Sequence, residues 1–310
     1  MKRDEIKSAI EKLVPDKEME QRLAEKISQK QNNKFSMKRI AALAATIVIV
    51  TNLGIFGHKL VEKKATTPPV VSNSGEGINI PKIQLPNQKG SKANMIGLIV
   101  YEGRIYTQSG TKISPEYGKK LLGEKLGTTK GNIDEWSKQK DYAVEFASTI
   151  GIAEVYSVKG YDKSFRIMTY TNQEGIVNAE FFECFNGITI KSGEDVFGKL
   201  KIENNISSAT LEKFESWNNN KQQYTELKNL QSLNNFIKEL KNTTPYTQES
   251  LMNLFDNQGD ANQKFIYITL KDGSEVQLRL FKNGYIFYNS SHCFFKMDNE
   301  AFHKFWNELN

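Results

Sequence analysis

The sequence has little of the chemistry that enzyme and metal sites usually require. Its 310 residues include only two cysteines, Cys184 and Cys293, and three histidines, His58, His292 and His303. No spacing of His, Cys, Asp or Glu matches a zinc or calcium site, and neither a Gly-x-Ser-x-Gly motif nor a phosphate-binding loop occurs. We therefore expect no metal, no cofactor and no catalytic centre.

The few candidate groups for catalysis are poorly arranged. In an extended strand His292 and Cys293 would point to opposite faces, and only a loop would let the imidazole meet the thiolate. His303 is expected on the wetter side of the last helix. Glu180 and Glu183 are expected to be solvent-facing residues of a strand. An extracytoplasmic hydrolase is thus the least favoured function.

Basic residues are unevenly distributed. Residues 1–39 contain 11 Lys and Arg against 7 Asp and Glu, whereas the rest of the chain contains 31 against 29. The overall charge of +6 therefore comes mostly from a short N-terminal arm, and the large C-terminal part is almost neutral. This distribution argues against nucleic-acid binding and favours attraction to anionic lipid.

One long run lacks any charge. Residues Ile40 to Phe56 lie between Lys38-Arg39 and His58-Lys59. Seventeen residues in a helix span about 25 Å, slightly less than a hydrocarbon core of about 30 Å, and snorkelling of the flanking basic side chains can make up the difference. The run predicts a transmembrane helix over 40–57, with Lys38, Arg39, His58 and Lys59 at the membrane interface. A buried core helix is the alternative.

The orientation follows from the basic residues near the run. Five Lys and Arg precede it within about 15 residues and three follow, which favours a cytoplasmic N-terminus and an extracytoplasmic C-terminal bulk. A cleaved signal peptide is disfavoured because 39 residues are too many for its basic region. A lipoprotein anchor is disfavoured because the first cysteine is Cys184. This location would permit a disulfide between Cys184 and Cys293.

The N-terminal arm, residues 1–39, has two short amphipathic stripes. Large apolar residues recur at helical spacing before and after Pro15, and they are too few for the arm to fold alone. The arm either lies on the membrane surface or docks on a cytoplasmic protein. The residues predicted to dock are Ile6, Ile10, Leu13, Met19, Leu23 and Ile27.

Residues 58–94 have the composition of a linker. Four of the seven prolines lie there, and the spacing of apolar residues in 78–86 indicates an edge strand. We expect two small modules after it, at 95–203 and 204–310. The order of strands, Asn-Gly turn and short aromatic-bearing helix recurs in both, so the modules are interpreted as related, although meandering α+β domains also look alike.

The segments expected after residue 95 define an α+β fold with antiparallel sheets. A hairpin is predicted over 96–107, and a helix opens at Ser114-Pro115-Glu116 and ends around 123–127. Further strands are expected at 153–159, 165–171, 176–185, 265–270 and 275–281, and further helices at 194–200, around 230–240, at 247–255 and after Asp298. Three dipeptides predict hairpin turns: Asn186-Gly187, Asp272-Gly273 and Asn283-Gly284.

The layout of the first 60 residues resembles a known class. Two short charged helices, the entry Met-Lys-Arg-Ile-Ala-Ala-Leu-Ala-Ala, and Leu-Gly-Ile-Phe-Gly-His-Lys with a linker after it resemble membrane-anchored proteins of low-GC Gram-positive bacteria that are related to anti-sigma factors. The resemblance implies a cytoplasmic segment that holds a sigma factor and an ectodomain that senses the envelope. The histidine and paired cysteines of the zinc-type anti-sigma signature are missing from residues 1–39. The ectodomain segments Ile-Gly-Leu-Ile-Val-Tyr-Glu-Gly-Arg-Ile-Tyr and Phe-Lys-Asn-Gly-Tyr-Ile-Phe-Tyr are similar to uncharacterised surface domains of such bacteria.

Two main hypotheses follow. The first is a single-pass sensor or regulator whose non-catalytic ectodomain binds a cell-wall or envelope ligand and whose arm docks a cytoplasmic partner. The second is an anchored binding or structural module with no cytoplasmic partner.

Overall fold

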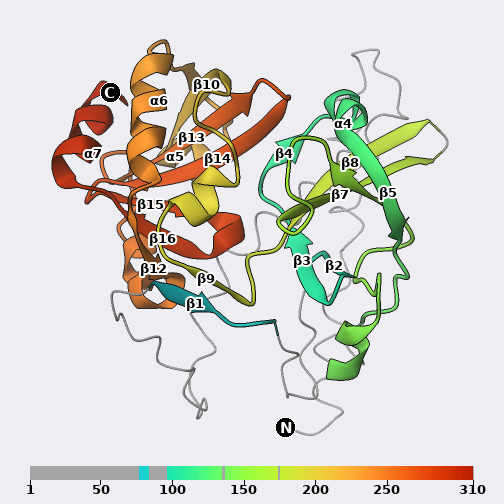
Figure 1. Ribbon diagram of the computed structural model, residues 1–310. Coiled ribbons are helices and arrows are strands. Elements are labelled where there is room, and N and C mark those ends of the chain that lie inside the picture. Colours follow the sequence, from blue (N-terminus) through green and yellow to red (C-terminus); the bar gives the residue numbers. More distant parts are fainter. Residues whose placement is uncertain (1–76, 84–95, 135–136, 174, 310) are drawn as a thin grey trace, which may run out of the picture. The chain divides into compact units, whose positions relative to one another are not determined.

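Antiparallel strands dominate the fold. The computed structural model describes residues 77–83, 96–134, 137–173 and 175–309, all within a compact unit that begins at residue 69. Every strand pair in these ranges runs antiparallel, and helices are in the minority (Figure 1). The predicted α+β class with antiparallel sheets is therefore confirmed.

Six strands form the first sheet, in the order β2-β3-β8-β7-β6-β5. Their bounds are β2 Leu98–Tyr101, β3 Arg104–Gln108, β5 Leu122–Thr128, β6 Glu154–Val158, β7 Arg166–Gln173 and β8 Ile176–Glu183. The hairpin predicted over 96–107 is confirmed as β2 and β3. Glu102 and Gly103 turn it with φ values of 49° and 66°, the positive values that a tight two-residue hairpin turn requires.

Helix α4 (Pro115–Leu121) begins as its residues predict. The Ser114 hydroxyl accepts a hydrogen bond from the Tyr117 amide, and Pro115 occupies the first turn, where its missing N–H costs nothing. The helix ends at Leu121, and the strand β5 that follows at once was not predicted. Gly123 and Gly127 permit β5, since a Cβ at either position would lie 2.3 Å from a side chain of the described chain.

The second sheet has eight strands. Seven follow the order β11-β10-β13-β14-β15-β16-β12, and β4 pairs with the start of β14. Their bounds are β4 Lys112–Ile113, β10 Ile206–Lys213, β11 Tyr224–Glu226, β12 Thr244–Thr247, β13 Gln263–Leu270, β14 Ser274–Phe281, β15 Tyr285–Tyr288 and β16 Cys293–Lys296. The predicted turns at Asp272-Gly273 and Asn283-Gly284 are confirmed, because they join β13 to β14 and β14 to β15.

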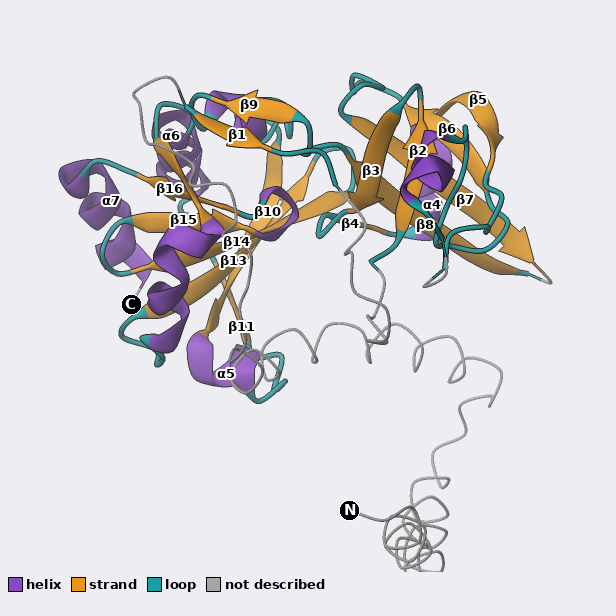
Figure 2. Ribbon diagram, turned by 90° about the horizontal axis from the view of Figure 1, so that it is seen from below, coloured by secondary structure: helices purple, strands orange, loops and turns teal. Residues whose placement is uncertain are grey.

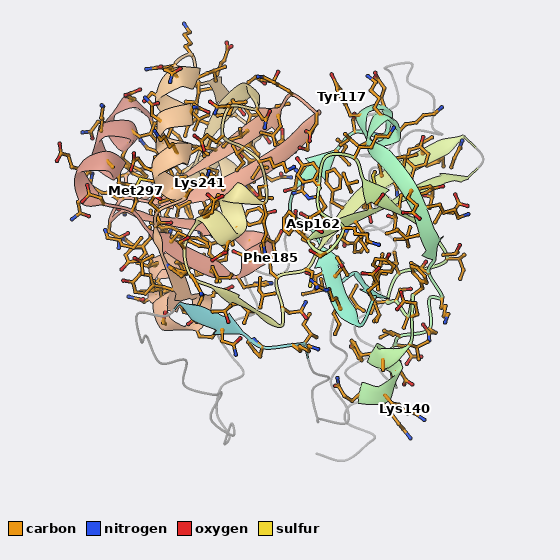
Figure 3. The ribbon with its side chains drawn as sticks, viewed as in Figure 1. Tyr117, Lys140, Asp162, Phe185, Lys241 and Met297 are labelled. Atoms are coloured by element: carbon orange, nitrogen blue, oxygen red, sulfur yellow. The ribbon has the colours of Figure 1, made fainter. Side chains whose placement is uncertain are left out.

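Helices cover both faces of this sheet. The remaining elements are α5 Phe214–Asn218, α6 Leu230–Leu240, α7 Asn299–Trp306, a π-helical turn η5 Glu194–Gly198, and 3-10 segments η4 Gln139–Ala143, η6 Gln248–Asp256, η7 Asn289–Ser291 and η8 Asn307–Leu309. Helices α6 and α7 bury their apolar stripes on one face, in a hydrophobic cluster that also includes Phe185 and Met297 (Figure 3). Aromatic rings of β13 and β14 occupy the other face, where α5 and η6 contribute Phe214 and Phe255.

The strand predicted between residues 78 and 86 exists, but its partner was not foreseen. Strand β1 (Ile78–Ile80) pairs with β9 (Ile188–Ile190) as a separate two-stranded sheet (Figure 2). The hairpin predicted at Asn186-Gly187 is therefore wrong. The Gly187 amide donates to the Ile80 carbonyl, and the side-chain amide of Asn186 donates to the Ile105 carbonyl. Because β1 and β3 accept these hydrogen bonds, the chain leaves β8 here and does not fold back onto it.

Several predictions lie outside the described residues. Within the described ranges no helix is long and apolar enough to cross a membrane, and residues 40–57 are not among them. The arm at 1–39 and most of the linker at 58–94 also lie outside. The division into modules at 95–203 and 204–310 stays a prediction. One large hydrophobic cluster runs from Ile78 to Leu309 and draws residues from both sides of that boundary.

Candidate functional site: a buried ionic junction

The main polar feature of the described chain is a buried ion pair between Arg166 and Glu183. These residues are cross-strand partners on β7 and β8, and both side chains are 0% exposed. The Arg166 Nε donates to Glu183 Oε1 at 3.0 Å, and the Arg166 Nη2 donates to the same oxygen. Because the guanidinium and carboxylate lie directly opposite each other, the pair forms the charge-assisted bonds that a buried charge needs.

The prediction that Glu183 faces solvent is wrong, while Glu180 is half-buried. Strand β8 changes character along its length: its first residues alternate in exposure, but residues 181–185 are all buried. The sequence Phe-Phe-Glu-Cys-Phe is therefore a strand end covered on both faces, where charge is expected only with a partner. That unbroken apolar run around a single acid is the signal that could have located the pair.

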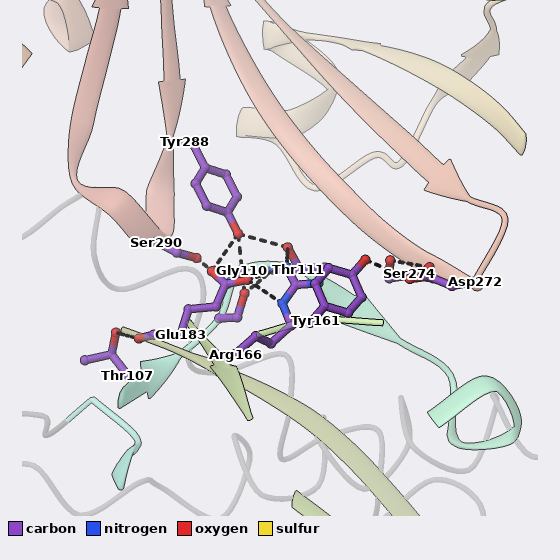
Figure 4. A network of polar contacts seen from close by, with 11 residues as sticks. Thr107, Gly110, Thr111, Tyr161, Arg166, Glu183, Asp272, Ser274, Tyr288 and Ser290 are labelled. Atoms are coloured by element: carbon purple, nitrogen blue, oxygen red, sulfur yellow. Dashed lines mark hydrogen bonds and ion pairs between the residues drawn. The ribbon is translucent and has the colours of Figure 1, made fainter. Parts of the chain in front are cut away.

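Tyr288 connects the Arg166–Glu183 ion pair of the first sheet to the second sheet (Figure 4). Its hydroxyl lies at the end of β15 and donates to Glu183 Oε2 at 2.8 Å. The same hydroxyl lies 2.9 Å from the Thr111 hydroxyl, next to strand β4. The Gly110 amide donates to the Ser290 hydroxyl at 2.8 Å, beside this contact. The junction thus joins β8 of one sheet to β15 of the other.

Aromatic rings enclose the Arg166 guanidinium. Its Cζ lies 4.4 Å from the Tyr161 ring centre, 5.4 Å from that of Phe165 and 4.7 Å from that of Phe181. The Tyr161 hydroxyl donates to Asp272 at 2.7 Å, in the turn between β13 and β14, which is a second link between the sheets. Among the described residues, Arg166 Nη1 is the only buried side-chain nitrogen or oxygen atom without a partner.

The electrostatics keep Arg166 charged and the phenols of Tyr288 and Tyr161 protonated near neutral pH. Burial alone would lower the pKa of Arg166, but Glu183, Tyr161 and Tyr288 together outweigh burial and the pKa is raised. Burial and Glu183 raise the pKa of Tyr288, and burial raises the pKa of Tyr161 to about 12. Both phenols therefore remain neutral hydrogen-bond donors near neutral pH, and their bonds to Glu183 and Asp272 fasten the strands together.

Within the described ranges, the two thiols and the imidazoles of His292 and His303 do not assemble into a site. Cys184 and Cys293 are both free and buried, so the disulfide considered from the sequence is not formed in this structure. The Cys293 thiol donates to the Ser291 carbonyl at 3.1 Å, and burial raises its pKa to about 12. His292 adopts a left-handed conformation with φ of 51°, and its Nδ1 lies 3.2 Å from Gln248 Oε1. His303 is exposed on α7, as predicted.

The other predicted site residues belong to the N-terminal arm and the membrane interface. The docking residues Ile6, Ile10, Leu13, Met19, Leu23 and Ile27, and the interface residues Lys38, Arg39, His58 and Lys59, lie outside the described ranges and stay predictions. In the described part of the chain, no cluster of three or more His, Cys, Asp or Glu side chains could hold a metal ion.

Comparison with known proteins gives no relative. No family model, no curated protein and no solved structure matches the chain.

Proposed function

We propose that this chain is a single-pass, membrane-anchored sensor or regulator with a non-catalytic extracytoplasmic binding domain. The observation that carries the proposal is the uncharged run Ile40–Phe56, with more basic residues before it than after it and a proline-bearing linker behind it. The α+β unit described above would be the ectodomain, composed of two related modules at 95–203 and 204–310. Its ligand would be a component of the cell wall or envelope.

The contacts of the folded part are compatible with a rigid binding domain. The ionic junction joins the two sheets through Tyr288, and the bond from Tyr161 to Asp272 repeats that link at a second place. Moving one sheet against the other would break these charge-assisted bonds. A ligand that binds to one sheet would therefore also affect the other. This rigidity supports a role in binding and transmission.

The location can be tested with paired reporter fusions. An alkaline phosphatase, active only outside the cytoplasm, and a fluorescent protein that matures only in the cytoplasm would each be fused after residue 310. We expect phosphatase activity without fluorescence. As a matched control, the same reporters fused after residue 36 should give the reverse result. Fluorescence from the C-terminal fusion would overturn the proposed topology.

The regulatory part of the proposal depends on the arm. By resemblance to membrane-anchored anti-sigma proteins, the apolar stripes would hold a sigma factor in the cytoplasm. Replacing Leu13 and Leu23 by Asp should abolish co-purification of such a partner, because each charge would have to enter an apolar groove. Ser8→Asp with Gln21→Asp, off the apolar stripes, is the control and should leave co-purification intact. If the Leu variants retain every bound protein, the chain is an anchored module without a cytoplasmic partner.

A further inference from the structure

A second arginine, Arg279, is held very differently from Arg166. It lies on β14, opposite Phe265 of β13, on the face of the second sheet that α5 and η6 cover. Its Nε donates to Gln263 Oε1 at 2.8 Å, and its Nη2 donates to the same oxygen. One edge of the guanidinium is thus bound to a neutral amide, and no carboxylate is involved.

Gln263 is fixed in place by the backbone of η6 and the residue after it. Its side chain is fully buried, and its Nε2 donates to the carbonyls of Leu254, Phe255 and Asn257 at 3.3, 3.4 and 2.8 Å. These bonds orient the Gln263 oxygen toward Arg279. The guanidinium is therefore oriented by a buried side chain that is itself held by three hydrogen bonds, the kind of support that gives binding sites a defined geometry.

Four aromatic rings surround the same guanidinium. The Arg279 Cζ lies 5.0 Å from the ring centre of Trp217, 4.8 Å from Phe255, 5.1 Å from Phe265 and 5.3 Å from Phe281. Trp217 comes from α5, directly after β10, and stacks on Phe265 with ring centres 4.3 Å apart. Phe255 comes from η6. Cation–π contact partly stabilises the charge and occupies none of the hydrogen-bond donors, so the donors that do not bind Gln263 remain free.

The positive charge of Arg279 has no compensating anion within the described ranges. Burial lowers its pKa to about 10, and no neighbouring charge adds to that effect, so the group remains charged at neutral pH. Its outer edge, formed by Nη1 and Nη2, has no partner there apart from the bond to Gln263. Arg279 is only half-buried, and its unbonded Nη1 is reached by solvent, since among the described residues the sole buried side-chain nitrogen or oxygen without a partner is on Arg166.

From this geometry we propose that Arg279 anchors a binding site for one carboxylate or phosphate group of a ligand that enters between Trp217 and Phe255. A guanidinium oriented by Gln263 with one free edge matches the two oxygens of such a group, and the aromatic rings shield the contact from part of the surrounding water. The inference deepens the proposed function by giving the chemical class of the ectodomain ligand, and it rests on that function only for the ligand's cellular source.

The chain has only six arginines, which makes the site easy to observe. The full-length protein would be purified in neutral detergent with ¹⁵N-labelled arginine and tryptophan. Inorganic phosphate and sodium acetate would be titrated separately at constant ionic strength. We expect a saturable shift of the Arg279 Nε–H signal and of the Trp217 indole signal, without a comparable shift of the Arg166 signal.

Two variants complete the experiment. Arg279→Lys keeps the charge but removes the planar fork, so the Trp217 signal should report at least about tenfold weaker binding. Arg104→Lys, at an exposed arginine that donates to the Ser164 carbonyl, should bind as the unmodified chain does. Near-UV circular dichroism verifies that each variant is folded.

Each outcome of the titrations either supports the proposed Arg279 site or overturns it. Equal binding by Arg279→Lys and the unmodified chain would overturn the site, and so would the absence of a saturable shift in the unmodified chain, whichever variants fold. A response to phosphate alone or to acetate alone would support the site and assign the oxyanion. The reporter fusions test the topology independently, so failure of the location and failure of the site cannot be confused.

Discussion

Replacing Glu183 by Gln should test the energetics of the ionic junction directly. The substitution keeps the shape of the side chain but removes its charge, and Arg166 is then a fully buried cation without a counter-charge. Removing one partner of a buried ion pair costs about 3–5 kcal/mol. The amide oxygen can take the place of Oε1 and still accept from Arg166, while the amide NH₂ in the place of Oε2 can donate to the Tyr288 hydroxyl, so we expect a loss near the lower end, about 3 kcal/mol.

The measurement is urea-induced unfolding of the full-length chain in detergent, followed by near-UV circular dichroism. A lower midpoint with an unchanged slope would show lost stability rather than a changed unfolded state. Glu116→Gln is the control, since Glu116 pairs with Lys120 in an ion pair whose side chains are 77% and 60% exposed. Its midpoint should not change measurably.

A double variant distinguishes the charge from the packing. Arg166→Met with Glu183→Leu removes both charges, and Tyr288 can still bond to Thr111. Such replacements are often neutral or stabilising, so the double variant should unfold at higher urea than Glu183→Gln alone. If Glu183→Gln shifts the midpoint no more than Glu116→Gln does, the pair carries no net energetic role and the reasoning about the junction fails.

Three further predictions concern the same folded part. The pKa of Tyr161 is about 12 in the folded chain against 10.0 for an ordinary tyrosine, so the folded state binds the phenolic proton more tightly than the unfolded state does. This contribution to the free energy of unfolding should be complete below pH 10 and should be lost as the pH rises from 10 to about 12. Urea titrations of Tyr161→Phe should show a smaller loss over that pH range. Gly193→Ala should cost about 1–3 kcal/mol in the same assay because its Cβ would lie 1.9 Å from a backbone oxygen, whereas Gly151→Ala, with open space around it, should be neutral. Cys184 and Cys293 should react with iodoacetamide only after unfolding, since both are buried and burial raises both thiol pKa values; rapid labelling of the native chain would contradict this.

Local signals in the sequence located most of the regular structure. The turns at Asp272-Gly273 and Asn283-Gly284 were predicted correctly because their strands pair with the nearest neighbour, so the dipeptide alone decides the hairpin. Asp298 was identified as the start of the last helix, and its carboxylate does accept the amides of the first turn. The hairpin predicted at Asn186-Gly187 was wrong because β9, the strand that follows the dipeptide, pairs with β1, which lies more than a hundred residues earlier in the chain.

The polar sites could not be predicted for a related reason. Glu183 is separated from Tyr288 by 105 residues, and nothing near either residue indicates the other. Arg279 lies in an alternating strand pattern in which a polar residue is expected to face solvent, and only the fold brings Trp217 and Phe255 over it. Charge pairs and aromatic cages formed between distant segments have no local sequence period to reveal them.

Strand β1 also has a mechanical consequence. It is the first described element of the chain and has only three residues, and it is held by its pairing with β9 and by the buried side chain of Ile78. With the membrane anchor proposed above on its N-terminal side, tension would reach β1 before the other strands of the described ranges. Peeling β1 from β9 would expose Ile78 at a cost of about 2–3 kcal/mol while the pairings within the larger sheets stay intact, so under that proposal β1 would be the first of the described strands to detach.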